Sequence, residues 1–365
     1  MTSLLTHAHR AAVDGAKPQK TKKQEGSLNV LKLLATITIV FAHYQQTSGT
    51  LFENGINFFH GEFNWGYMVE LFFILSGYFT YSYARRTNAG DTFFSFWWKK
   101  YMRFLPLLFI TGLATCGVLC WRSIRFGSDF YYSLWACLGG MFGFGRWFTT
   151  DSIINNPTWY IDVLLLCYAV FYYATYLAKK NNSHPAAVYL VVACVGILMY
   201  EISIQYKFTV PFFSTHIARG LFSFFLGLLL RELLDTFTPH EKPLWIVLSA
   251  LYVLGFTYLY MKHNDFVAEQ QYYLLTLTVF PTLIILFKIE FLQNLFSGRF
   301  FTDLSGITYH TFMWHTPIRY LFIYGLRLMS IPYKTRAAMY LCLVISFVVG
   351  TLSFAVETRI KKKRT

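Results

Sequence analysis

Apolar segments of about 18 residues or more recur along most of this chain, and no other feature limits its possible folds as strongly. Such segments are long enough to cross the hydrocarbon core of a bilayer as α-helices. Charged residues make up only 14% of the chain, against about 25% in soluble domains. The short alternating segments typical of a transmembrane barrel are not evident. The sequence therefore predicts an all-α, polytopic membrane protein built as a helical bundle.

Basic residues flank the apolar region at both ends and suggest how it is oriented. Residues 1–27 read as a disordered cytoplasmic tail, 28–357 as the membrane domain and 358–365 as a second basic cytoplasmic tail. Because positive segments stay in the cytoplasm, two basic ends predict an even number of spans. We expect about ten transmembrane helices, at 28–46, 66–84, 102–121, 158–178, 186–205, 214–234, 243–261, 270–288, 306–327 and 337–357. The shorter apolar stretch 131–145, within a Gly- and aromatic-rich outer loop, is expected to lie at the interface or to re-enter.

Charge and cysteine usage exclude two other classes of protein. The formal charge of +14 would suit nucleic acid, but the basic residues cluster at the edges of apolar segments, as membrane topology requires. The six cysteines lie mostly within apolar runs and lack the spacing of metal ligands. We therefore expect no nucleic-acid partner, no metal site and no disulfide framework.

The first apolar run carries a cation and an imidazole, Lys32 and His43. Eleven helical residues amount to about three turns, so both side chains lie on one face, roughly 16 Å apart. Polar side chains within a span face protein or water rather than lipid. The pattern favours chemistry across the bilayer, although a snorkelling lysine and a structural histidine remain possible.

Three more segments carry polar side chains in apolar surroundings. Glu70 precedes the run Leu71-Phe72-Phe73-Ile74-Leu75-Ser76-Gly77-Tyr78. Lys100 and Arg103 end a basic, aromatic segment that starts at Phe93. The third segment is Thr308-Tyr309-His310-Thr311-Phe312-Met313-Trp314-His315-Thr316-Pro317.

In this order, the four segments resemble the acyltransferase type 3 family of integral membrane acyltransferases over about residues 28–355. The family has a basic residue and a histidine with ten residues between them, an acidic residue before Phe-Phe-x-Leu-Ser-Gly, and a basic pair before its third helix. A Ser/Thr-Tyr…Trp-His-x-Pro segment follows near the end, and Arg219 to Gly227 is similar to an Arg…Phe-Leu-x-Gly helix of the family. The resemblance implies transfer of an acyl group, usually acetyl from acetyl-CoA, to a hydroxyl of a cell-surface or secreted glycan. The partners would be acyl-CoA, a carbohydrate acceptor and the bilayer of the cell membrane; the oligomeric state is left open.

The resemblance also implies roles for the residues that match. His43 would act as the general base or as a transient acyl carrier, with Glu70 orienting its imidazole. Lys32, Lys100 and Arg103 would bind the phosphates of the donor, although the positive-inside rule alone explains basic loops.

The remaining candidates concern packing and the acceptor. Ser76, a candidate for the donor site, and Gly77 would permit close helix or backbone approach near the path of the donor. Tyr309, His315 and Arg219 are candidates for substrate binding. Tyr309 and His315 are six residues apart, so they point about 120° from each other on a helix.

The chain also departs from the family pattern. Leu164 stands where many members have Glu in a Trp-Ser-Leu-x-x-Glu segment, with Asp162 nearer the tryptophan, and Lys replaces Arg at 32 and 100. Lysine keeps the charge but loses the bidentate fork. A proton-coupled transporter or flippase that uses His43, Glu70 and Lys32 as a relay is the main alternative, although inverted repeats are not evident. A protein of the same fold that senses or exports an acylated product is a second alternative.

Overall fold

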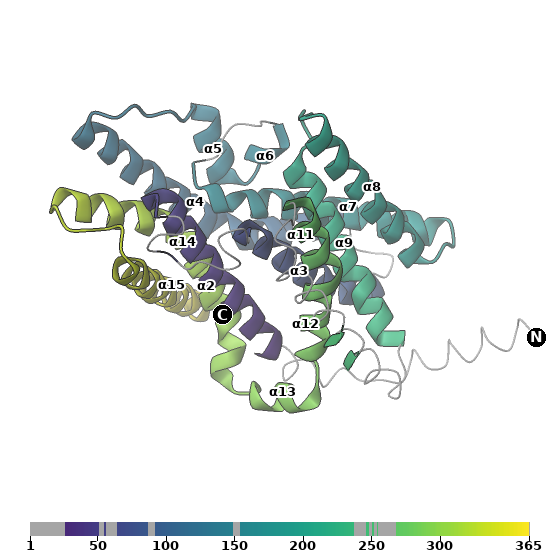
Figure 1. Cartoon of the computed structure of the whole chain (residues 1–365). Coiled ribbons are helices and arrows are strands. Elements are labelled where there is room, and N and C mark those ends of the chain that lie inside the picture. The colour runs from purple at the N-terminus through teal and green to yellow at the C-terminus, as the bar shows by residue number, and fades with distance from the viewer. Residues whose placement is uncertain are drawn as a thin grey trace, which may run out of the picture.

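The apolar runs form long α-helices in a computed structural model of the chain (Figure 1). The structure describes residues 26–50, 55, 64–86, 92–148, 154–236 and 268–364, with five single positions between 246 and 254. The expected disordered tail and the expected span 243–261 lie almost wholly outside these residues. Five of the described helices are long and apolar enough to cross a membrane: residues 26–48, 93–126, 156–180, 185–205 and 336–363. The chain is thus an all-α, multi-pass membrane protein; ten spans and the orientation of the termini stay predictions.

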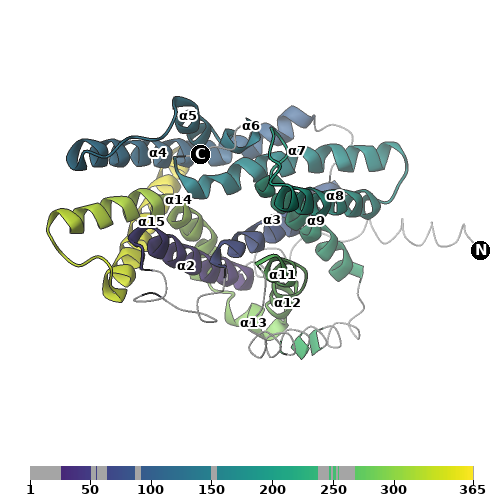
Figure 2. The ribbon, with the colours of Figure 1, turned by 45° about the horizontal axis from the view of Figure 1, so that its top comes forward.

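The helices fall into two packed groups. The first comprises α2 (Gly26–Ser48), α14 (Arg299–Leu328) and α15 (Arg336–Arg364); the second comprises α3 (Met68–Arg86), α7 (Trp159–Lys180), α8 (Pro185–Gln205) and α9 (Thr215–Thr236). The long helix α4 (Phe93–Phe126) contacts both α14 and α7 and so joins the groups. Figure 2 shows α4 and α7 above α2 and α3, with α14 between them.

Two further segments complete the described architecture. After α9, the chain continues at α11 (Ala268–Leu274), a π-helical turn (Leu275–Val279) and α12 (Phe280–Leu286), with the short α13 (Glu290–Leu295) before α14. The expected re-entrant stretch forms α5 (Leu134–Phe142) and α6 (Gly145–Phe148). The nine residues of α5 rise only about 14 Å, too little to cross a bilayer. α5 ends at Gly143, whose φ of 77° suits glycine.

Glycines bring α3 and α9 unusually close together. A methyl group added at Gly77 would overlap the carbonyl oxygen of Phe224, and one at Gly227 would overlap that of Ile74. Small residues at a helix–helix contact permit this approach in membranes. The expectation that the Ser76–Gly77 pair permits close backbone approach is therefore met at Gly77, and the contact holds α3 in a fixed position beside the cavity described next.

Candidate functional site

A cavity of about 530 Å³ lies between α2, α3, α4, α7 and α14. Its size is within the range of about 300–1,000 Å³ usual for small-molecule sites. The residues around it share an aromatic and hydroxyl-rich character, interrupted by cations. They are Leu28, Asn29, Lys32, Phe72, Ser76, Tyr78, Phe79, Thr80, Ser82, Lys100, Arg103, Phe104, Tyr160, Leu164, Tyr168, Arg231, Lys288, Thr302, Ser305, Thr308, Tyr309 and Phe312.

Five of these residues are cationic: Lys32, Lys100, Arg103, Arg231 and Lys288. No aspartate or glutamate lies among the described residues that line the cavity. Arg231 forms an ion pair with Asp235, which does not line the cavity. Cations gathered in one wall repel one another, and binding an anion lowers their energy. The cavity is therefore suited to a polyanionic ligand with an apolar or hydroxyl-bearing part.

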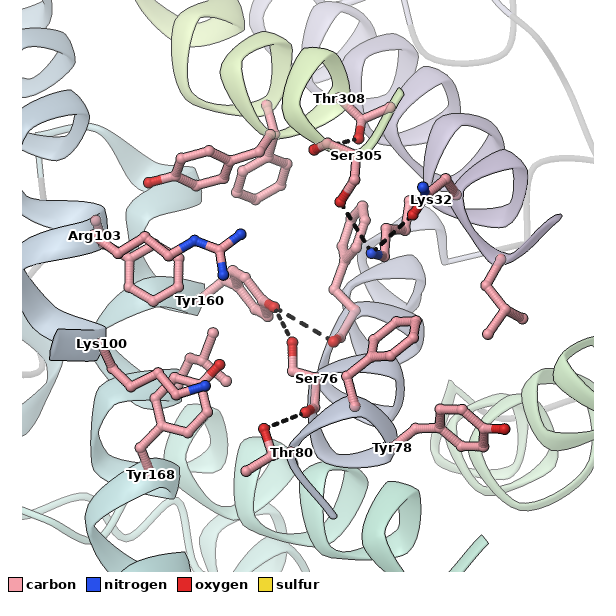
Figure 3. A pocket seen from close by; sticks show the side chains of 18 of the residues that line it. Lys32, Ser76, Tyr78, Thr80, Lys100, Arg103, Tyr160, Tyr168, Ser305 and Thr308 are labelled. Atoms are coloured by element: carbon pink, nitrogen blue, oxygen red, sulfur yellow. Dashed lines mark hydrogen bonds between the residues drawn. The ribbon is translucent and has the colours of Figure 1, made fainter. Parts of the chain in front are cut away.

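Three of the five cations were expected from the sequence. Lys32 donates hydrogen bonds to Ser305 Oγ at 3.1 Å and to Asn29 Oδ1 at 3.2 Å, which fixes the ammonium group at the wall. Lys100 Nζ lies 4.7 Å from the centre of the Tyr168 ring. In Figure 3, Lys100 and Arg103 enter the cavity from one side and Lys32 from the other.

Between these walls, Ser76 and Tyr160 join α3 to α7. Ser76 Oγ and the Tyr160 hydroxyl are 2.9 Å apart (Figure 3). Tyr160 lies beside the tryptophan of the segment in which the family glutamate is missing. Asp162 of that segment is fully buried, and it accepts a hydrogen bond from the backbone N–H of Arg146 at 3.0 Å. Asp162 thus anchors α6 to α7 and does not line the cavity.

Tyr309 and Phe312 extend from α14 and close one end of the cavity. The Tyr309 ring packs edge-on against Phe104, with centroids 5.7 Å apart. The Phe312 ring contacts Phe72 at 5.6 Å on the cavity side and His315 at 5.8 Å. Phe312 therefore lies between the cavity and the histidine of the late motif.

His315 and His43 stack on each other beyond Phe312. Their ring centroids are 5.3 Å apart and the rings are inclined by 26°. His315 is fully buried, and its Nδ1 lies 2.6 Å from the carbonyl oxygen of Phe312. Because a carbonyl oxygen only accepts, Nδ1 carries the hydrogen, and Nε2, which has no hydrogen-bond partner among the described residues, presents a lone pair.

His43 occupies a similar position on α2. Its Nδ1 lies 3.1 Å from Gln46 Oε1, which leaves Nε2 on the other edge of the ring. His43 does not line the cavity. The ring of Phe312, which lines the cavity, contacts His315 and so lies between the cavity and the stacked imidazoles.

Arg319 follows His315 by one helical turn and was not expected to be part of the site. Its side chain is 3% exposed, and its Nε and Nη1 have no hydrogen-bond partner among the described residues. Its guanidinium carbon lies 4.8 Å from the centre of the Tyr320 ring. Buried N–H groups without acceptors are costly inside a protein and more so in a membrane, so Arg319, one turn after His315 on α14, is a candidate for stabilising negative charge.

The structure does not bring Glu70 to His43. Glu70 is fully buried and forms a salt bridge with Arg219 Nε. The expectation that Glu70 orients the His43 imidazole is therefore not met, because the carboxylate is engaged elsewhere and the group against His43 is His315. Sequence reasoning placed both charges within spans but could not pair residues 149 positions apart.

Arg219 is held in place by more than its carboxylate. Its Nη2 donates a hydrogen bond to the carbonyl oxygen of Gly66 at 3.0 Å. Its guanidinium lies 5.2 Å from the ring of Tyr67 and 5.1 Å from that of Trp159. These contacts tie α9 to the start of α3, and Arg219 does not line the cavity.

Sequence reasoning missed Arg231, Lys288, Tyr160 and Tyr168 as members of the cavity. In the sequence, the positive-inside rule alone explains the positions of Arg231 and Lys288. The sequence offers one clue to a further role: each of the two residues stands alone at the end of an expected span rather than in a basic cluster. The two tyrosines carried no signal among the 26 tyrosines of the chain.

Comparison with known proteins gives one match. The family model of the acyltransferase 3 group, described as an acyltransferase domain, matches residues 25–356. This range includes every motif from Lys32 to His315 and confirms the resemblance. Searches of curated proteins and of solved structures found no match.

Proposed function

The chain belongs to the acyltransferase 3 family of membrane acyltransferases, and on that premise we propose that it moves an acyl group, acetyl in the first instance, from cytoplasmic acyl-CoA to a hydroxyl of a cell-surface or secreted glycan. The observation that carries the proposal is the cationic cavity, which ends at Phe312 with two stacked imidazoles directly beyond it. Such an arrangement suits an anionic donor on one side of a reaction centre.

The donor binds in the cavity by its phosphates. Lys100 and Arg103 supply charge-assisted hydrogen bonds, and arginine grips a phosphate with two parallel N–H groups. Both residues lie in the first third of α4, and the positive-inside rule predicts that this part of the helix faces the cytoplasm, where CoA thioesters are found. The pantetheine arm then runs past Ser76 and Tyr160 towards Phe312, with the thioester leading.

At the imidazoles, His43 Nε2 takes the proton of the acceptor hydroxyl as its oxygen attacks the thioester carbonyl carbon. The C–S bond then breaks, and the proton passes to the CoA thiolate. In the covalent version His43 first accepts the acyl group and then yields it to the acceptor. In both versions Arg319 stabilises the negative charge on the carbonyl oxygen, and His315 holds the stacked ring in place.

The test uses the purified full-length protein in lipid nanodiscs with radiolabelled acetyl-CoA. We expect CoA release with a glycan acceptor, and an acylated His43 by mass spectrometry without one if the covalent version holds. His43→Gln should lower turnover by at least about a hundredfold, the lower bound for a general base, while acetyl-CoA binding is retained. Proton-coupled uptake into proteoliposomes that carry the same protein, without CoA release, would instead establish a transporter. Full activity in His43→Gln would remove His43 from the mechanism.

A further inference from the structure

Two cations that the sequence assigned to topology meet at one aromatic ring. Arg231 of α9 donates a hydrogen bond from Nη1 to the Tyr78 hydroxyl at 3.1 Å, and its guanidinium carbon lies 5.0 Å from the ring centre. Lys288, in the connection between α12 and α13, places Nζ 5.7 Å from the same centre. Asp235 holds the Nε edge of Arg231 at 3.1 Å. Two elements distant in sequence thus deliver positive charge to one point of the cavity wall.

This Tyr78 cluster, defined as Tyr78, Arg231 and Lys288, is separate from the basic pair on α4. In Figure 3, Lys100 and Arg103 lie on one side of the cavity and Tyr78 lies on the other. The cavity therefore has two cationic poles, with the Ser76–Tyr160 bond between them.

The two poles also differ in their distance from the imidazoles. Arg103 is followed by Phe104, whose ring packs against Tyr309, one turn of α14 before Phe312. The basic pair on α4, Lys100 and Arg103, therefore adjoins the end of the cavity at which Phe312 contacts His315. The Tyr78 cluster belongs to the opposite side.

Coenzyme A carries phosphate in two places, a pyrophosphate joined to the pantetheine arm and a 3′-phosphate on the ribose. A thioester on a carrier protein has the pantetheine arm but only one phosphodiester. A CoA thioester therefore fits two separated cationic poles better than a carrier-bound donor does. Each of its two phosphate sites can then form charge-assisted hydrogen bonds with its own cations.

We propose that Tyr78, Arg231 and Lys288 bind the 3′-phosphate of the donor, and that Lys100 and Arg103 bind its pyrophosphate. The inference rests on the proposed function and deepens it, because it assigns the two phosphate sites of the donor to separate cations and predicts selection by the 3′-phosphate. Lys288 contributes a flexible point charge, whereas Arg231 is pre-oriented by Asp235.

The experiment measures binding of acetyl-CoA and of 3′-dephospho-acetyl-CoA to the full chain in nanodiscs. The unmodified protein should bind acetyl-CoA at least about tenfold more tightly, the effect of one charge-assisted contact. Arg231→Gln with Lys288→Gln should abolish this preference by weakening acetyl-CoA alone, and Arg231→Lys should keep part of it. Lys100→Gln with Arg103→Gln should weaken both ligands and keep the preference.

Arg299→Gln is the matched control, because Arg299 is a cation on the neighbouring segment with an 89% exposed side chain that does not line the cavity. It should leave both affinities unchanged. Size-exclusion profiles and thermal midpoints identify any variant that fails to fold. If the double variant fails to fold, Lys288→Gln alone tests the 3′-phosphate site, because Lys288 lies outside a helix.

Equal affinity of the unmodified protein for both ligands would overturn the subsite while leaving acyl-CoA as the donor. Equal weakening of both ligands by the Arg231 and Lys288 variant would do the same. Absence of binding by either ligand would overturn the proposed donor, and the subsite with it.

Discussion

The Glu70–Arg219 ion pair gives a sharp test of whether Glu70 is a catalytic or a structural residue. Replacing Arg219 by Met leaves the carboxylate of Glu70 alone at a site with no exposure, where its second oxygen already lacks a hydrogen-bond partner among the described residues. Replacing Glu70 by Leu leaves the cation of Arg219, which retains the Gly66 carbonyl and two aromatic rings. Replacing both leaves two apolar side chains of similar volume.

The structure sets the order of the effects. Breaking a buried pair costs about 3–5 kcal/mol, whereas replacing both partners by packed apolar side chains is close to neutral. Arg219→Met should fall at the upper end of that range, because the Glu70 side chain is 0% exposed against 13% for Arg219. Glu70→Leu should fall at the lower end. At about 2 °C per kcal/mol for a large chain, the single variants should lose roughly 6–10 °C in thermal midpoint.

The assay is intrinsic tryptophan fluorescence during heating in nanodiscs at one scan rate, combined with CoA release. Arg299→Met is the control, because it breaks an exposed ion pair with Asp303 at 3.8 Å, which contributes at most about 1 kcal/mol. The double variant should regain both midpoint and activity. A double variant that is stable but inactive would refute the structural role and assign the Glu70 carboxylate to the chemistry.

Two further variants test the donor pole and the helix contact. Lys100→Ala with Arg103→Ala should raise the KM for acyl-CoA by about a hundredfold, for two charge-assisted contacts, while the exposed neighbour Lys99→Ala leaves it unchanged; an unaltered KM in the double variant would remove the pair from the donor site. Gly77→Ala places a methyl group on the backbone of α9 and should lower stability by about 1–3 kcal/mol, as overpacking does. Gly117→Ala, where the methyl group meets no heavy atom within 4 Å, should leave stability unchanged. Equal thermal midpoints for the two variants would show that the contact between α3 and α9 tolerates a methyl group.

The position of residues along one helix could be predicted from the sequence. The spacing of Lys32 and His43 placed both side chains on one face, and the structure brings both against α14, at Ser305 and His315 respectively. Tyr309 and His315 likewise face different surroundings, because Tyr309 lines the cavity and His315 stacks on His43. Both results follow from helical geometry alone.

Contacts between helices could not be predicted in the same way. The sequence indicates that Glu70 and Arg219 need partners. Their pairing depends on how α3 packs against α9, which a single sequence does not specify. The positive-inside rule alone would explain Arg231 and Lys288, so their charge carried no further information until the fold placed both at Tyr78. The basic residues of a membrane enzyme can thus serve topology and ligand binding together.

The ring of Phe312 has a consequence for the membrane as an electrical insulator. A permanent aqueous channel would dissipate the ion gradient across a bilayer. A polar cavity that continued to the imidazoles would form part of such a channel. The Phe312 ring, which lines the cavity, contacts Phe72 on one side and His315 on the other, and so stands between the cavity and the imidazoles. In the proposed reaction the ring would turn aside for the thioester, and the thioester would then fill the opening, so that no continuous aqueous path would form.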